Sequence, residues 1–187
     1  QKQLLFEEQH LERLKKASRY FAYPFDSENL RQKIEKECQA CDFQQDYRLR
    51  IILSKSGEIE LSRQILTPLN PSFCKAKLCL QEADLNQAFT YFKTTHRPHL
   101  SLGEQEIIYH NAAGELLETS IGNLVLKIAG KLYTPPTSLG ILPGIYRQHL
   151  LETGQVEEKV LTVPDLDQAE TIYGCNAVRG LYELEVI

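Results

Sequence analysis

Lys93 is placed where an amine could act as a nucleophile or a base. It directly follows the aromatic residue Phe92, in a segment that continues to Arg97. Partial desolvation by apolar neighbours lowers the pKa of a lysine amine and makes it reactive. An arbitrary lysine is usually a solvated surface residue, so Lys93 alone supports this chemistry only weakly.

A carboxylate and a glycine-rich loop follow the lysine along the chain. A turn at Gly114 leads into a short segment that ends at Glu118, where a carboxylate could face a ring nitrogen. Residues 140–144 are rich in Gly and Pro and lead directly into a predicted helix. Free amides at the start of a helix bind phosphate well. A plain helix start with a fixed turn is the alternative interpretation of the loop, and for the loop alone it is the favoured one.

The order of these parts resembles one known family from end to end. The matching segments are 10–14, 93–97, 118–124, 140–145 and 175–177. Together they resemble the fold-type IV enzymes that depend on pyridoxal 5'-phosphate (PLP), the class-IV aminotransferase family. The resemblance implies a two-lobed α+β fold like that of D-amino-acid aminotransferase, with a small N-terminal lobe and a larger strand-rich C-terminal lobe.

The resemblance also implies a role for each matching residue. Lys93 matches the catalytic lysine that joins PLP as a Schiff base, and Glu118 matches the carboxylate that pairs with the pyridine nitrogen. The cofactor phosphate would be held by Arg13, by the amides of Ile145 and Tyr146, and by Asn176.

Within the family, two segments look most like the aminodeoxychorismate lyases, particularly those fused to or encoded beside aminobenzoate synthase. These segments are Thr94–Arg97 and Gly174–Gly180. The resemblance implies conversion of 4-amino-4-deoxychorismate to 4-aminobenzoate and pyruvate for folate biosynthesis. It also implies a homodimer, with association with aminobenzoate synthase as a further partner.

Two other functions stay open at this point. A D-amino-acid or branched-chain transaminase needs the same lysine and glutamate, so these residues cannot separate transamination from the lyase reaction. Pro98 stands where a branched-chain transaminase often has tyrosine, which disfavours that enzyme mildly. A non-catalytic relative that serves as a binding module is the third hypothesis, because the family's first strand is missing and the stretch from Lys93 to Glu118 is short.

Composition restricts the remaining classes of function. The 187 residues include 21 basic and 25 acidic side chains, with a pI near 5.8, so a nucleic-acid partner is not expected. No apolar run approaches the ~18 residues of a membrane helix, and the first residues do not resemble a signal peptide. We therefore expect a cytoplasmic protein without a membrane partner. The chain has no Met and begins at Gln, so we also expect that part of the protein lies outside this sequence.

The five cysteines do not predict a metal site. Cys38 and Cys41 lie on a predicted helix, Cys74 and Cys79 are close to or within a predicted strand, and no His pair accompanies them. We interpret these four as reduced core residues.

Periodicity predicts the elements that must position the site. Apolar residues at helical spacing predict helices over 6–21 and 27–42, and a later helix should run from about 144 to 153. Alternation and turn residues predict strands over 47–53, 58–66, 75–80, 106–110, 123–128, 156–163, 170–174 and 181–187. We expect a boundary between the lobes after residue 88, giving lobes of residues 1–88 and 89–187.

Overall fold

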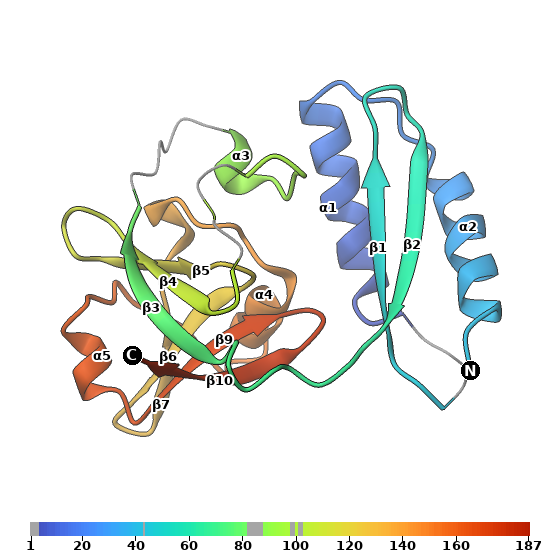
Figure 1. Cartoon of the computed structure of the whole chain (residues 1–187). Helices are drawn as coiled ribbons and strands as arrows, with labels where there is room; N and C mark the ends of the chain where they lie inside the picture. The colour runs from blue at the N-terminus through green and yellow to red at the C-terminus, as the bar shows by residue number, and fades with distance from the viewer. Residues whose placement is uncertain (1–3, 43, 82–87, 98–99, 101–102) are drawn as a thin grey trace. The chain divides into compact units, whose positions relative to one another are not determined.

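The computed structural model describes residues 4–42, 44–81, 88–97, 100 and 103–187. The chain divides into two compact units, Gln1–Pro68 and Leu69–Ile187 (Figure 1). Each unit has a hydrophobic core of its own. The class is α+β, with most of the strands in the second unit, as the sequence predicts.

The first unit combines two helices with a β-hairpin. Its elements are α1 (Glu7–Tyr20), α2 (Ser27–Gln39), β1 (Tyr47–Leu53) and β2 (Ile59–Ile65). Asp26 caps α2, because its side chain accepts hydrogen bonds from the amides of Glu28 and Asn29 at 3.0 Å. The buried core comes from both helices and the hairpin: Leu11, Leu30, Ile34 and Ile59.

The second unit is built on one sheet that closes on itself. Its strands are β3 (Lys75–Leu80), β4 (Glu106–His110), β5 (Leu116–Thr119), β6 (Asn123–Ile128), β7 (Lys131–Thr134), β8 (Glu157–Glu158), β9 (Thr171–Asn176) and β10 (Gly180–Val186). The strand order is β5-β4-β3-β10-β9-β6-β7-β8, and β5 also pairs with β6. This extra pairing joins the two ends of the series from β5 to β6, so these strands form a closed ring.

Short helices accompany the sheet of the second unit. They are α3 (Ala88–Tyr91), the 3-10 turn η1 (Thr137–Leu139), α4 (Ile145–Glu152) and α5 (Asp165–Gln168). Strand β6 is buried on both faces, and this explains how α4 is held. Leu124 and Leu126 pack into the main core of the unit, whereas Val125 points the other way and packs with Leu150 of α4. Because side chains alternate along β6, one face of the strand packs into the main core and the other packs against α4. Strand β6 thus joins the sheet to α4, the helix that follows the glycine-rich loop.

Two predictions about the elements need correction. The units divide after Pro68 and not after residue 88, because β3 pairs with β4 and β10 and so belongs to the second unit. The strand predicted over 156–163 is also wrong: only the two-residue strand β8 forms there. After β8 the chain contributes a single bridge, between Glu115 and Thr162, and then turns into α5.

Candidate functional site

Glu118 lies near the end of β5 and is 2% exposed. Its strand partner is Asn123, at the start of β6. Burial raises the pKa of the Glu118 carboxyl above its ordinary value, because desolvation disfavours the charged form. The positive charge of Arg97 and a hydrogen bond from the Leu142 amide are the main opposing influences, since both favour the carboxylate.

Arg97 is the ion-pair partner of Glu118. Its Nη2 lies 3.0 Å from Glu118 Oε1, and the two side chains are 14% and 3% exposed. The Arg97 Nε is also buried, and it has no hydrogen-bond acceptor among the residues that the structure describes. Arg97 therefore places a desolvated positive charge directly beside the carboxylate.

Lys93 lies just after α3, in the loop that leads to Arg97. Its side chain is exposed, so the partial desolvation expected from its aromatic neighbour is not seen. Its charge is one of the influences that lower the pKa of Glu118. Within this loop, Thr94 Oγ1 donates to the carbonyl of His96 at 2.6 Å, and the His96 ring packs edge-on against Phe89 of α3 at 5.2 Å. The structure thus brings the predicted lysine into the electrostatic surroundings of the predicted carboxylate.

The glycine-rich loop is fixed to the same strand pair through Leu142. The Leu142 amide donates to Glu118, and the Leu142 carbonyl accepts from Asn123 Nδ2 at 2.9 Å. Gly140 begins this loop with a φ of 83°, a conformation that favours glycine. One residue of the loop is therefore held by both members of the β5–β6 pair.

The start of α4, which was predicted to bind phosphate, follows directly after the loop that Leu142 fixes to the β5–β6 pair. Gly144 is the N-cap of α4 and supplies no side-chain cap, and the first amide bonded within the helix is Gln148, to the Gly144 carbonyl at 2.9 Å. The amides of Ile145 and Tyr146 precede it, so they project from the helix start. A Cβ at Gly144 would lie 2.0 Å from Asn123 Oδ1, which shows how closely the loop approaches Asn123.

The two remaining predicted phosphate contacts are placed differently. Asn176 ends β9, and its Oδ1 accepts from the amides of Val178 and Arg179 at 3.0 and 2.9 Å, so this oxygen shapes the turn into β10. Arg13 lies on α1 in the first unit, 3.4 Å from His10 Nδ1. A phosphate contact by either residue stays a prediction.

Sequence reasoning missed the residues that support Glu118. Arg97 stands in the motif that suggested the family but was given no role, and its signal was its place four residues after Lys93. Asn123 closes the motif that begins at Glu118 and was likewise given no role. The contact of Leu142 with both could not be found, because it depends on how the loop returns to the sheet.

A second buried carboxylate also went unnoticed. Glu106 on β4 is 0% exposed and accepts hydrogen bonds from Ser120 Oγ and, at 3.1 Å, from the Tyr182 hydroxyl. Burial raises the pKa of Glu106, and these hydrogen bonds oppose the shift. This group fastens β4 to the residue two positions beyond Glu118 and to β10.

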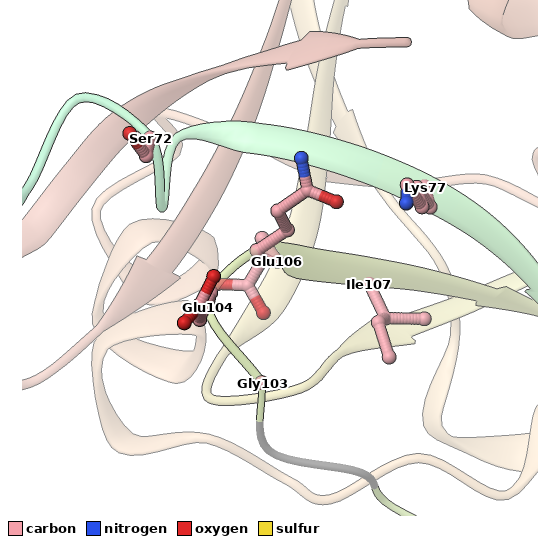
Figure 2. Close-up of a pocket in the computed structure, with 7 residues that line it drawn as sticks. Ser72, Lys77, Gly103, Glu104, Glu106 and Ile107 are labelled. Carbon is pink, nitrogen blue, oxygen red and sulfur yellow. The ribbon is translucent and has the colours of Figure 1, made fainter.

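A hollow of about 610 Å³ lies beside β3 and β4. Figure 2 shows Lys77 of β3 and Ile107 of β4 at its wall, with Glu104 and Glu106 close to each other. Its lining includes none of the predicted site residues. The candidate site described above is therefore separate from this hollow.

Cysteine positions differ in part from the prediction. Cys38 packs against the core of the first unit, but Cys79 is exposed on β3, so its assignment to the core is wrong. Within the described ranges, no cluster of three or more His, Cys, Asp or Glu side chains is arranged to hold a metal ion. The same ranges contain no helix with the length and apolar character needed to cross a membrane.

Comparisons with curated proteins identify relatives of two kinds. Aminodeoxychorismate lyase of Saccharomyces cerevisiae is 26% identical over 199 residues, covering 78% of this chain and 53% of its own length. A Thermotoga maritima protein described as a branched-chain-amino-acid aminotransferase is 27% identical over 190 residues, covering 92% of this chain and 68% of its own length. The chain thus spans about half the length of the yeast relative.

Solved structures share the fold over nearly the whole chain. A structure described as an amino-acid aminotransferase from Mesorhizobium loti has a TM-score of 0.85 and 25% identity. The match covers 96% of this chain and 91% of the Mesorhizobium loti chain. A Mycobacterium tuberculosis aminotransferase in its PLP-bound form has a TM-score of 0.77 and 20% identity, covering 97% and 76%. The family model for amino-transferase class IV, a PLP-dependent family, matches residues 1–187. This chain therefore belongs to the class IV aminotransferase family.

Proposed function

We propose that the protein is a PLP-dependent lyase that converts 4-amino-4-deoxychorismate to 4-aminobenzoate and pyruvate, in folate biosynthesis. The observation that supports PLP as the cofactor is the buried Glu118 carboxylate. It is bound by Arg97 at 3.0 Å and is close enough to Lys93 for the charge of Lys93 to lower its pKa. The 26% identity to the yeast lyase supports the choice of reaction.

The residues of the second unit fit PLP at three points. Lys93 provides an exposed amine that can join the cofactor aldehyde. Glu118 provides a carboxylate for the pyridine nitrogen, in a setting where Arg97 favours its charged form. The start of α4 provides the amides of Ile145 and Tyr146 for the phosphate. Arg13 and Asn176 complete the proposed phosphate contacts.

Each residue has a distinct task in the proposed reaction. When bound, PLP supplies a ring that accepts the electrons released at the amine-bearing carbon of the substrate. Glu118 keeps the ring nitrogen protonated, which makes the ring a better electron acceptor. The Lys93 amine would hold PLP, and the same amine would be the base that takes the proton from the amine-bearing carbon of the substrate. The C–O bond between the ring and the enolpyruvyl group would then break, the departing enolpyruvate would take up a proton to become pyruvate, and the remaining ring would become aromatic.

Product analysis tests this function. Purified protein supplied with PLP and 4-amino-4-deoxychorismate should release 4-aminobenzoate and pyruvate in equal amounts, and Lys93→Ala should abolish both. Lys93→Ala should also remove the visible absorption of covalently bound PLP. Absence of 4-aminobenzoate together with amino-group transfer to 2-oxoglutarate would overturn the lyase assignment.

A transaminase acting on branched-chain or D-amino acids is the second candidate. It is favoured by the 27% identity to the Thermotoga maritima protein over 92% of this chain. Lys93 and Glu118 would keep the same tasks, since both reactions begin with removal of the same proton. A non-catalytic binding module is the third candidate, and failure of the protein to bind PLP at all would favour it.

We also propose that the protein is a homodimer and that it associates with aminobenzoate synthase. Both proposals rest on the resemblance to the lyases. Light scattering of the purified protein should give twice the monomer mass, and a monomer with full activity would contradict the dimer. Co-purification with aminobenzoate synthase, compared with an unrelated protein of similar charge, tests the second partner.

A further inference from the structure

The ion pair between Arg97 and Glu118 differs from the exposed ion pairs of the second unit. Its side chains are 14% and 3% exposed, whereas those of Lys127 and Glu170 are 40% and 44% exposed. An exposed pair contributes little, because water already solvates both charges. Removing one partner of a buried pair leaves the other charge without compensation in a desolvated site. Arg97 is therefore placed to control the state of Glu118.

We propose that Arg97 is a positioning residue that holds Glu118 as an oriented carboxylate for the ring nitrogen of PLP, an inference that rests on the proposed function. Arg97 acts through Glu118 and needs no contact with the reacting atoms. Its Nη2 binds Oε1, and a carboxylate has further acceptor sites on its two oxygens for a ring N–H.

Two features explain why an arginine suits this position. Its guanidinium stays charged even when it is desolvated, whereas a buried lysine readily loses its proton. It also lies in the same loop as Lys93, four residues later, so the loop that carries the amine also fixes the carboxylate. A protonated Glu118 could still occupy this site, but it could not pair as an anion with a protonated ring nitrogen. PLP would then bind less tightly, and it would do so in a pH-dependent manner.

PLP affinity at several pH values tests the proposal. The apo forms of the wild type, Arg97→Met, Arg97→Lys, Glu118→Gln and the Arg97→Met/Glu118→Gln double variant are titrated with PLP and followed by absorbance and protein fluorescence. Arg97→Met should weaken PLP binding severalfold near neutral pH, because Glu118 then loses the positive charge that favours its anionic form. The deficit should shrink as the pH rises, because Glu118 then ionises without help. Arg97→Lys should give a smaller deficit than Arg97→Met, because a lysine favours the Glu118 anion only while it stays protonated.

The double variant separates this role from a general structural one. If Arg97 acts through Glu118, the double variant should bind PLP no more weakly than Glu118→Gln alone. Additive losses, or an Arg97→Met deficit that does not change with pH, would overturn the proposal. An unchanged PLP affinity combined with a raised KM for substrate would also overturn it, since Arg97 would then bind substrate.

Controls make each outcome decisive. Lys127→Met removes a cation from an exposed pair and should leave PLP binding unchanged. Arg97→Gln, which also removes the charge, should reproduce the pH-dependent deficit if Arg97→Met does not fold. A wild type that binds PLP, with visible absorption that Lys93→Ala abolishes, is required first. If the wild type does not bind PLP, the proposed function itself is refuted. If the wild type binds PLP and only the Arg97 variants behave otherwise than expected, only the role proposed for Arg97 is refuted.

Discussion

Asn123 and Leu142 are joined by a hydrogen bond of 2.9 Å from the Asn123 side-chain amide to the Leu142 carbonyl. The Leu142 amide in turn donates to Glu118, the strand partner of Asn123. The loop that leads into α4 is therefore fixed to the strand pair that carries the candidate carboxylate. The spacing between the two ends of the proposed cofactor site depends on this arrangement.

Asn123→Ala should destabilise the protein by about 1–3 kcal/mol, because it leaves the buried Leu142 carbonyl without its donor. PLP affinity should fall as well, since the loop loses one of its two attachments. Urea unfolding and PLP titration measure the two effects. Asn70→Ala, at an exposed position where the side chain bonds only the Ser72 amide among the described contacts, is the matched control and should change stability less. Equal effects of the two substitutions would contradict the conclusion that Asn123 fixes the loop through Leu142.

Gly144→Ala should destabilise the protein by about 1–3 kcal/mol, the usual cost of inserting atoms into a packed site. The new Cβ would lie 2.0 Å from Asn123 Oδ1, and the Asn123 amide cannot turn away without losing its bond to Leu142. Thermal unfolding checks this. For comparison, Gly103→Ala would meet its nearest atom at 3.8 Å and should leave the melting temperature nearly unchanged. A melting temperature of Gly144→Ala equal to that of the wild type would show that Asn123 is not tightly held.

Arg147→Met should cost about 1–3 kcal/mol, because it leaves the carbonyl of the buried Pro135 without its donor, whereas Glu158 is 46% exposed and stays solvated. Arg147 is 2% exposed, and its Nη2 donates to the Pro135 carbonyl at 2.8 Å and to Glu158. Lys131→Met removes a cation from the neighbouring exposed pair with Glu157 and should cost less than about 1 kcal/mol. Guanidinium unfolding of both variants measures the two losses of stability. Similar unfolding midpoints would show that Arg147 stabilises the protein no more than the exposed Lys131 does.

The sequence predicted what depends on local pattern. Helices α1, α2 and α4 and most strands followed from periodicity and turn residues, whereas the roles of Lys93 and Glu118 came from the family resemblance and stay predictions. The boundary at Pro68 was missed because β3 belongs to the second unit through its strand partners, which lie far along the chain. Lys75 of β3, for example, pairs with Glu185, 110 positions later. Leu142 was missed for the same reason, because its hydrogen bond with Asn123 forms only when the loop is folded onto the sheet.

Glu106→Gln should flatten the dependence of stability on pH. Burial raises the pKa of Glu106 above the ordinary value of 4.5, so the folded protein holds this proton at pH values where the unfolded chain has released it. The free energy of unfolding should therefore fall as the pH rises from the ordinary value through the raised one. Glutamine cannot ionise, and its amide can still bond the hydroxyls of Ser120 and Tyr182.

Glu118 adds to the same slope, since its pKa is raised too, so the comparison must include Glu118→Gln and the double variant. Each single variant should remove part of the slope, and the double variant should remove more than either. Denaturant unfolding at a series of pH values measures this, with Glu183→Gln as an exposed control on β10 whose profile should follow the wild type. A steeper decline in Glu106→Gln, or a stability of the wild type that rises over this range, would mean that hydrogen bonds from Ser120 and Tyr182 outweigh burial. Glu106 would then be an anion at neutral pH that β4 and β10 hold in place.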